Sequence, residues 1–299
     1  MDRLQAMATF VAVVDGGSFA SAARKLELSP PVVTRAVAEL EERLQLRLLT
    51  RTTRMVRVTE AGARYAEDCR RILAEVEEAE SAATGTHGAP RGTLSLTAPV
   101  LFGQMYVTPL LVRYLKRFPE VDAQCLFLDR VVNLMEEGVD VAVRIAELPD
   151  SSLQAVRVGR VRRVLVAAPA YLEAHGMPKR PEDLPDHVTV SAAGLSAQPE
   201  WRFSVDGQPR TQRVAPRLRT TTNDSAISAT LAGLGIARLL SYQAAPHVAA
   251  GTLVPVLQEF ESAPVPIHVV HQEGRRATKK VRDFIDMAVE SLRADPALR

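Results

Sequence analysis

The chain has 299 residues, of which 46% are hydrophobic and 24% charged, a composition that excludes a disordered or collagen-like protein. Its formal net charge of +2 does not by itself indicate a polyanionic partner, and it contains no apolar run of the roughly 18 residues that a membrane-spanning helix needs. The length favours two domains. Cys69 and Cys125 stand alone, without C-x-x-C spacing, which argues against a disulfide framework and against a cysteine zinc site.

The first three predicted elements are helices. Residues 2–15 form the first, with one face made of Leu4, Ala8, Val11 and Val14, and a glycine pair at 16–17 ends it. Because this start lacks the positive charge of a signal peptide, we expect it to be retained and the protein to be cytoplasmic. A short helix capped by Ser18 follows and runs to Leu26, its buried face consisting of Phe19, Ala22, Ala23 and Leu26.

A three-residue turn leads into the third helix, which Ser29 is expected to cap and in which Pro30 suits the first turn. Its apolar stripe has helical spacing and consists of Val33, Val37, Leu40 and Leu44. Helix, tight turn and helix form the skeleton of a helix-turn-helix. The stretch 46–58 is rich in leucine and arginine, then alternates in polarity, which indicates a small β-wing.

A long helix is predicted from Thr59, its N-cap, to about residue 84, and residues 85–90 are typical of a flexible hinge. Its apolar positions alternate in steps of four and three, the pattern of a coiled coil, and are Tyr65, Cys69, Ile72, Val76, Ala79 and Ala83. One helix cannot bury such a stripe alone. We therefore expect it to pack against the same helix of a second subunit.

From Arg91 the pattern changes to alternating strands and helices, which predicts a mostly parallel sheet covered by helices. The strands are predicted at 94–97, 121–128, 139–143, 161–167, 187–191, 234–240, 253–256 and 266–270, with a hairpin across residues 206–207. The helices are predicted after Pro99 to about 117 and at 131–137, 169–174, 225–233 and 276–293. Some 200 residues favour two lobes, the first about 91–160 with 266–299 and the second about 161–265.

Several segments together carry a family resemblance. Residues 19–41, FASAARKLELSPPVVTRAVAELE, with LRLLTRTTR at 46–54 and VTEAG at 58–62, resemble the DNA-binding region of LysR-type transcriptional regulators. The resemblance continues through DR at 129–130, EGVDVAVR at 137–144, PAYL at 169–172 and LGI at 234–236. Pro31 and Thr34 stand where alanine and serine are common in the family, a difference that bears on base preference.

The resemblance implies an α/β protein with three parts. These are a winged helix-turn-helix domain (1–58), a linker helix that pairs between subunits (59–84), and, after the hinge at 85–90, a two-lobed effector domain (91–299) resembling periplasmic solute-binding proteins. It also implies a homodimer or homotetramer that reads an interrupted inverted repeat in double-stranded DNA near a promoter. RNA polymerase is a further candidate partner, and no membrane is involved.

The DNA contacts are expected at the start of the third helix and in the wing. Pro31, Arg35, Ala38 and Glu42 lie opposite the apolar stripe, with Thr34 at the edge of that face. The N-terminal part of a recognition helix reaches base edges, where arginine pairs with guanine and an apolar group meets a thymine methyl. The predicted contact residues are Ser29, Pro30, Pro31, Thr34, Arg35, Arg51 and Arg54, the last two neutralising phosphates.

The effector site is expected where two helices begin. The first strand of the effector domain ends at Ala98, Pro99 and Val100, and a second helix starts near Asn223 and Asp224. Two helix starts facing one cleft attract a small anion, so the sequence favours a small carboxylate effector, with Arg144 adding charge. An ordinary surface role for Arg144 is equally consistent with the sequence, and Asp224 leaves a neutral or mixed-polarity effector open.

Catalytic interpretations find little support. His268 and His271 point to opposite faces of a strand, so they cannot share a metal, and neither a G-x-S-x-G elbow nor a complete dinucleotide-binding fingerprint occurs. We therefore expect no enzyme, no cofactor and no metal. Two alternatives remain: an α/β enzyme with an appended DNA-binding domain, and a DNA-binding protein that needs no ligand.

Overall fold

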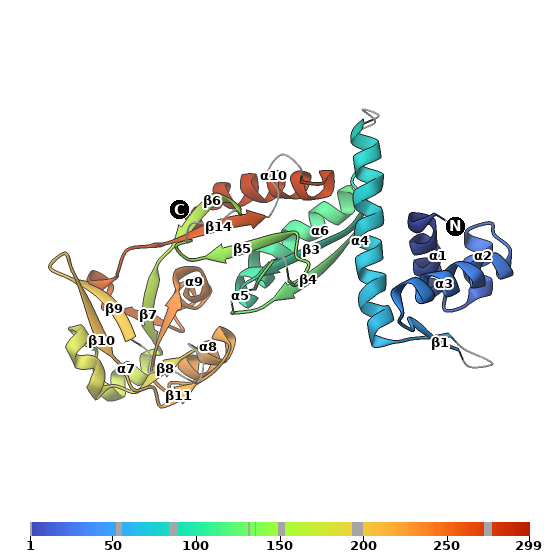
Figure 1. The fold of residues 1–299 in the computed structure, drawn as a ribbon. Helices are drawn as coiled ribbons and strands as arrows, with labels where there is room; N and C mark the ends of the chain where they lie inside the picture. The colour runs from blue at the N-terminus through green and yellow to red at the C-terminus, as the bar shows by residue number, and fades with distance from the viewer. Residues whose placement is uncertain are drawn as a thin grey trace. The chain divides into compact units, whose positions relative to one another are not determined.

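The computed structural model describes residues 2–51, 56–83, 89–130, 132–134, 136–148, 153–192, 200–271 and 277–299. The chain divides into two compact units, one that ends at Gly88 and one that begins at Ala89 (Figure 1). Most of the predicted hinge, and Arg54, lie outside the described residues. Each unit has its own hydrophobic core.

Three helices form the core of the first unit: α1 (Arg3–Gly16), α2 (Phe19–Lys25) and α3 (Pro30–Leu44). The predicted stripe of α3 is confirmed, because Val33, Val37 and Leu40 are fully buried. The predicted inner face of α1 is only the edge of its buried surface, since Leu4, Val11 and Val14 pack against the core. The four residues of that face are half-buried, whereas Met7, Phe10 and Val13 fill the core, because α2, α3 and α4 all pack against this helix.

The remainder of this unit is a two-stranded wing and one long helix. Strands β1 (Leu49–Arg51) and β2 (Val56–Val58) pair antiparallel, and α4 (Glu60–Ala83) follows. Thr59 is the N-cap, since its side-chain oxygen accepts a hydrogen bond from the Gly62 N–H at 2.9 Å. Cys69, on the predicted stripe of α4, is fully buried against this unit's own core, with Tyr65 and Ile72 beside it. The first half of the stripe therefore packs within its own chain and not against a second subunit.

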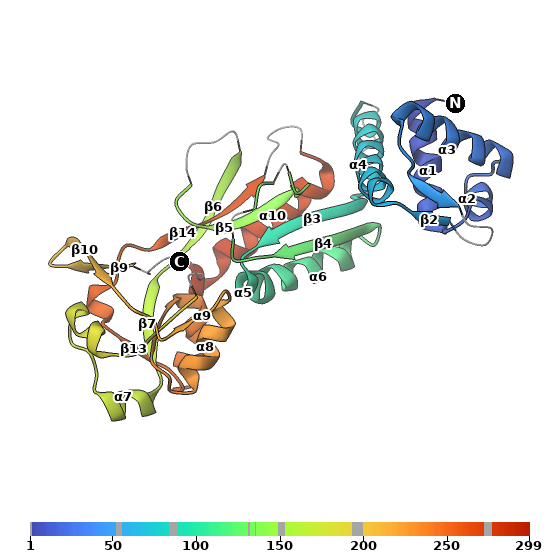
Figure 2. The same ribbon diagram turned by 60° about the horizontal axis from the view of Figure 1, so that its bottom comes forward.

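The second unit contains two five-stranded sheets, each with helices packed against it (Figure 2). The first sheet has the order β4-β3-β5-β14-β6. Its strands are β3 (Gly92–Ala98), β4 (Val121–Phe127), β5 (Val141–Ile145), β6 (Gln154–Val161) and β14 (Val265–His271). One continuous helical stretch, made of α5 (Val100–Phe102), the π-helical turn η1 (Gly103–Val107) and α6 (Thr108–Arg117), covers it together with α10 (Lys279–Ala294).

The second sheet has the order β11-β8-β12-β7-β13. Its strands are β7 (Arg163–Ala167), β8 (Thr189–Ser191), β11 (Leu218–Arg219), β12 (Ile236–Leu240) and β13 (Val254–Val256). Helices α8 (Asn223–Leu231) and α9 (Ser241–Ala249) pack on one face. On the other face lie α7 (Pro169–His175) and the hairpin of β9 (Glu200–Val205) and β10 (Gln208–Arg213). Together with the first sheet this gives the predicted two lobes.

Several details of the prediction are wrong. The sheets are mixed rather than mostly parallel: β3 is parallel to β4 and β5, but β14 runs antiparallel to β5 and β6, and β7 runs antiparallel to β12 and β13. The described part of 131–137 forms turns instead of a helix, since Val132 and Leu134 pack with Val139 in a small core over β5. Strands β6 and β11 and helix α9 were not anticipated.

No single helix in the described part of the chain is both long and apolar enough to cross a membrane. The pair α1 and α2 passes on length and composition only, with a bend of 120° between them, and both helices contribute buried residues to the first core.

Candidate functional site

The N-terminal half of α3 presents an exposed face. Ser29 occupies the N-cap position but its side chain makes no capping hydrogen bond, which corrects its expected role. Pro30 and Pro31 are both exposed, and the apolar Val32 beside them is 38% exposed. The predicted set omits Val32, although the Pro-Pro-Val-Val run indicated an apolar start to this helix. The outward face thus begins with a small apolar surface suited to a thymine methyl group.

Arg35 and Thr34 both have partners within the helix. The Arg35 Nε donates to Glu39 Oε1 at 2.9 Å, although 82% of the Arg35 side chain is exposed. This hydrogen bond from Arg35 is the largest cause of the lowered pKa of Glu39. Thr34 donates its hydroxyl to the Pro30 carbonyl oxygen at 2.9 Å. An exposed ion pair contributes little free energy, so Glu39 holds Arg35 weakly and leaves it accessible.

The wing is attached to α3 by one carboxylate. Glu41 Oε1 accepts hydrogen bonds from the backbone N–H groups of Leu48 and Leu49, at 2.8 and 2.9 Å. Thr59 holds the other end of the wing, donating its hydroxyl to the Arg47 carbonyl oxygen at 2.8 Å. Sequence reasoning missed both links, because each joins residues that are far apart in the helical and strand patterns. They fix the wing to α3 and to the start of α4.

The two arginines predicted to contact phosphates lie in or next to the wing turn. Arg51 is the last residue of β1, paired with Val56 of β2, and its side chain lies outside the described atoms. Arg54 falls in 52–55, outside the described residues. Their roles stay predictions.

In the second unit, the two predicted helix starts meet at one residue that the sequence prediction omitted. Asp129 follows β4, and its Oδ1 accepts a hydrogen bond from the Val100 N–H at 3.0 Å. Its Oδ2 accepts from Asn223 Nδ2 at 3.3 Å. One carboxylate therefore joins the helix start of the first lobe to that of the second. Asp129 stood in the DR dipeptide of the family resemblance, which was the available signal.

The other predicted residues of this site do not join the two lobes in this way. Ala98 is buried and its carbonyl accepts from the Leu128 N–H at 2.9 Å, while Pro99 is half-buried. Asp224 turns back on its own helix and accepts from the Ser225 N–H at 3.0 Å. A hydrogen bond from the Thr222 side chain is the main cause of its lowered pKa. Arg144 donates to the Val132 carbonyl oxygen at 2.6 Å, within the first lobe.

Aromatic rings pack across the two lobes next to this carboxylate. Phe102 stacks on Tyr106 with ring centroids 4.7 Å apart, and Tyr242 of α9 meets Phe102 edge-on at 5.4 Å. Burial raises the pKa of Tyr242, and the Gln243 side chain donates to its hydroxyl oxygen at 3.2 Å. The lobes therefore meet through an apolar contact as well as through Asp129.

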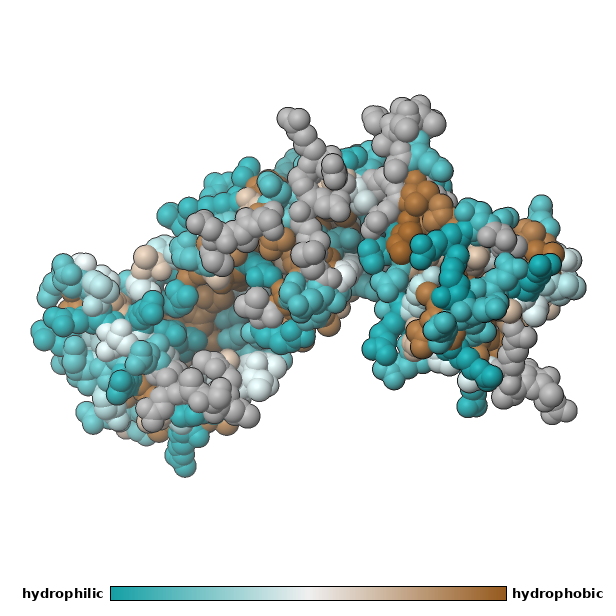
Figure 3. All heavy atoms as spheres, in the orientation of Figure 1, coloured by the Kyte–Doolittle hydropathy of each residue, from teal (hydrophilic) through white to brown (hydrophobic). Residues whose placement is uncertain are grey.

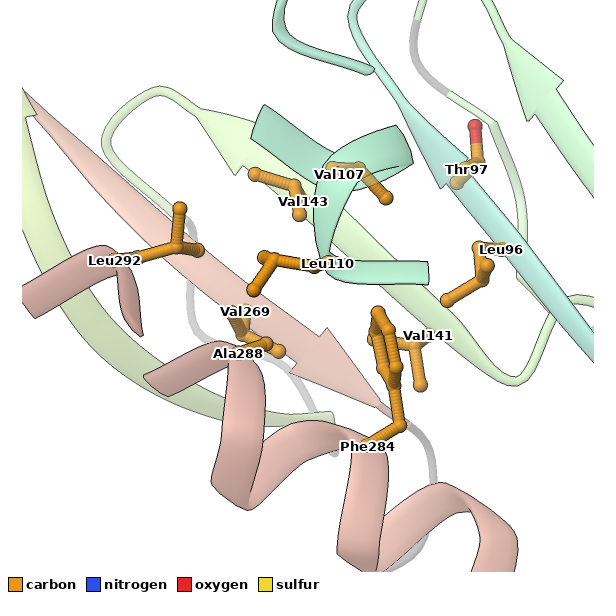
Figure 4. A pocket seen from close by; sticks show the side chains of 10 residues that line it. All are labelled: Leu96, Thr97, Val107, Leu110, Val141, Val143, Val269, Phe284, Ala288 and Leu292. Atoms are coloured by element: carbon orange, nitrogen blue, oxygen red, sulfur yellow. The ribbon is translucent and has the colours of Figure 1, made fainter. Parts of the chain in front are cut away.

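Two cavities lie in the first lobe, and Tyr106 lines the larger one. One, of about 10 Å³, is enclosed in the first lobe between the sheet and the helices α6 and α10, and nearly all of its lining is apolar (Figure 4). The other, of about 550 Å³, is a surface recess along η1, α6 and the end of α10. None of the six predicted effector residues lines either one.

Two family models match the chain. The first, for a bacterial regulatory helix-turn-helix protein of the lysR family, matches residues 4–63, and the second, a LysR substrate binding domain, matches residues 87–293. An HTH-type transcriptional repressor of Pseudomonas aeruginosa is 33% identical over 301 residues, covering 100% of this chain and 95% of that protein. The HTH-type transcriptional activator AaeR of Escherichia coli K12 is 32% identical over 96% of this chain and 93% of its own length.

Solved structures agree with this assignment. CrgA, a LysR-type transcriptional regulator from Neisseria meningitidis, has 31% identity and a TM-score of 0.63, covering 96% of this chain and 98% of that chain. The Vibrio cholerae virulence activator AphB has 27% identity and a TM-score of 0.62, covering 97% and 99%. The predicted fold class is confirmed: a helix-turn-helix domain with a wing precedes a two-lobed α/β domain. The chain belongs to the LysR family of DNA-binding transcriptional regulators.

Proposed function

We propose that the protein binds an interrupted inverted repeat near a promoter, as a homodimer or homotetramer, and that a small effector held between the lobes controls this binding. The observation that supports the DNA-binding part is the exposed start of α3, together with a wing attached to the same helix by Glu41. This protein acts in the cytoplasm, with RNA polymerase as a further partner and without turning its effector over.

Base reading rests mainly on Arg35. Its guanidinium can make two parallel hydrogen bonds to guanine once it leaves Glu39, and leaving an exposed ion pair costs less than about 1 kcal/mol. The bidentate contact is worth about 1–3 kcal/mol, so the exchange favours DNA. Glu39 would also lie near phosphates and oppose binding wherever Arg35 finds no guanine. Arg35 and Glu39 together therefore discriminate between DNA sequences, in addition to the affinity that Arg35 contributes.

The test compares two variants on cognate and scrambled duplexes over a salt series. Arg35→Ala is expected to weaken cognate binding by about 1–3 kcal/mol and to leave the scrambled duplex nearly unchanged. Glu39→Gln, which frees Arg35 without removing it, should strengthen binding to both duplexes and narrow the difference between them. Equal losses on both duplexes in Arg35→Ala would show that Arg35 contacts only the backbone.

The assembly is proposed to use the second half of α4. The first half of its stripe packs on the core of its own unit, whereas Val76 lies beyond the α4 residues of that core. Figure 3 shows hydrophobic side chains gathered near α4 and α1, in keeping with a surface that needs a cover. A two-fold pair of such helices matches an inverted-repeat site.

The effector is proposed to be compact and of mixed polarity. The Asp129 carboxylate already accepts the Val100 N–H, which is the position that a carboxylate effector would otherwise take. A ligand with a donor group facing Asp129 fits this arrangement better than a simple anion does. By binding one arrangement of the lobes more tightly, it would shift their equilibrium by a coupling of about 1–3 kcal/mol.

A further inference from the structure

The second lobe contains three arginines whose positions bring their charges together. Arg163 lies on β7 and Arg238 on β12, and the antiparallel register pairs Arg163 with Leu240 and Arg238 with Leu165. Since side chains two residues apart share a face of a strand, both arginines project on the same face, diagonally across the strand pair. Arg202 belongs to β9, in the hairpin that covers that face.

Burial and mutual repulsion both affect the pKa values of these arginines. The pKa of Arg238 is lowered to about 10, first by burial and then by the positive charges of Arg163 and Arg202. The pKa of Arg163 is lowered by burial and by Arg202. Arg163 and Arg238 are half-buried, while Arg202 is exposed, so the cluster can be reached from solvent.

The acidic side chains near this cluster that the structure describes are paired with other arginines. Within the described ranges of the chain, no carboxylate forms an ion pair or hydrogen bond with any of the three guanidinium groups. Glu261 pairs with Arg162 at 2.7 Å, and Glu200 with Arg213 at 3.3 Å, so both acids are engaged elsewhere. Residues 193–199, which precede β9, contain neither aspartate nor glutamate.

Packing accounts for one of the three arginines. The Arg238 guanidinium carbon lies 5.6 Å from the centroid of the Trp201 ring, a cation–π contact that stabilises its charge. This contact explains neither Arg163 nor Arg202. Half-buried like charges without a counter-charge are costly, and such costs are retained at binding sites where a ligand supplies the missing charge.

We propose that Arg163, Arg202 and Arg238 form a binding site for a small phosphorylated molecule on the second lobe, separate from the effector site between the lobes. Guanidinium groups bind phosphate oxygens through paired hydrogen bonds, and a phosphate dianion offsets two of the three charges. Trp201 is the only tryptophan of the chain, so its emission reports directly on this site.

The experiment titrates the full chain with inorganic pyrophosphate at ionic strength held constant with sodium chloride, following Trp201 emission and calorimetric heat. We expect a saturable change for the wild type. Arg163→Gln and Arg202→Gln should each weaken binding by about tenfold or more, the loss of one charged contact. Arg210→Gln, an exposed arginine on the same hairpin, is the matched control and should bind as the wild type does.

The Arg202→Gln variant guards against a folding defect, because Arg202 is exposed and does not stack on the tryptophan. Pyrophosphate should also raise the melting temperature of the wild type and not that of Arg163→Gln. A response that sodium chloride alone reproduces, or equal binding by all four proteins, would overturn the proposal. Citrate binding more tightly than pyrophosphate would overturn the assignment to a phosphate group.

Discussion

Replacing Gly62 with alanine should destabilise the first unit, against the usual effect of this change in a helix. Alanine is favoured over glycine in a helix interior by about 1 kcal/mol, so propensity alone predicts a more stable protein. A Cβ at Gly62 would lie only 2.0 Å from the Leu48 carbonyl oxygen and 2.9 Å from its carbon. These are backbone atoms, which cannot rotate away as a side chain would.

The magnitude follows from what must move. Carbon and oxygen approach no closer than about 3.3 Å, so α4 would have to retreat from the wing by more than about 1 Å. The same carbonyl accepts a hydrogen bond from the Thr59 N–H at 3.0 Å and lies 3.1 Å from the Thr59 hydroxyl, whose one proton is shared with the Arg47 carbonyl oxygen, and the retreat would weaken both contacts. Overpacking costs about 1–3 kcal/mol and each lost hydrogen bond about 1 kcal/mol. The net effect is a loss of about 2 kcal/mol.

Thermal denaturation of the full chain measures this loss. A domain of this size changes its melting temperature by about 4–8 °C for each kcal/mol. Ala63→Gly, at an exposed position in the same turn, calibrates helix propensity and should lower the melting temperature modestly. If helix propensity governs stability, Gly62→Ala should raise the melting temperature and Ala63→Gly should lower it. If the steric conflict governs, both variants should melt at a lower temperature than the wild type. A Gly62→Ala protein as stable as the wild type would refute the close approach of α4 to the wing.

Three further outcomes are expected. Val76→Asp should give monomers and abolish tight operator binding, as followed by sedimentation and gel shift; a wild type that sediments as a monomer at micromolar concentration would exclude the proposed helix pairing. Asp129→Asn should destabilise the second unit by about 0.3–1 kcal/mol, because a negative charge at a helix start is lost, with Asp122→Asn, exposed on β4, as the control. Arg238→Met should raise the melting temperature at neutral pH. The pKa of Arg238, lowered to about 10, means that the folded state disfavours the charged guanidinium by on the order of 3 kcal/mol. The cation–π attraction to Trp201 offsets only about 1–2 kcal/mol of this cost. Above about pH 10 the folded state binds fewer protons than the unfolded state, so the stability of the wild type should rise with pH in that range. An Arg238→Met variant less stable than the wild type at neutral pH would contradict the predicted cost of this buried charge.

Local signals predicted much of the fold. Periodicity and capping residues located α2, α3, the wing and α4, because those features depend on neighbours within one or two turns. What failed depends on distant parts of the chain. Phe10 is buried because three other helices surround α1. Strand β14 is antiparallel because the chain returns to the first sheet only after completing the second.

Helix α9 escaped prediction for a local reason: Pro246 lies inside it, and proline normally argues against a helix interior. Residues 131–137 carried apolar residues that are typical of a helix, but the described ones, Val132 and Leu134, pack in a turn.

In the candidate site too, features with a local sequence signal were predicted and contacts between distant residues were missed. The exposed face of α3 followed from angular spacing alone, and the structure places Pro31 and Arg35 on it. The partner of Arg35 was also within reach, since Glu39 stands four residues later. Asp129 was missed as the meeting point of two helix starts because its partners lie 29 and 94 residues away in the sequence. Sequence spacing carries no information on contacts at that separation.

The attachment of the wing by Glu41 has a consequence for how this protein can change its operator during evolution. Glu41 holds the wing from the half-buried side of α3, while Pro31, Arg35 and Ala38 point outward from the same helix. Substitutions at the outward positions therefore leave the link to the wing intact. New operator sequences can be acquired by exchanging a few exposed residues, without rebuilding the scaffold that positions them.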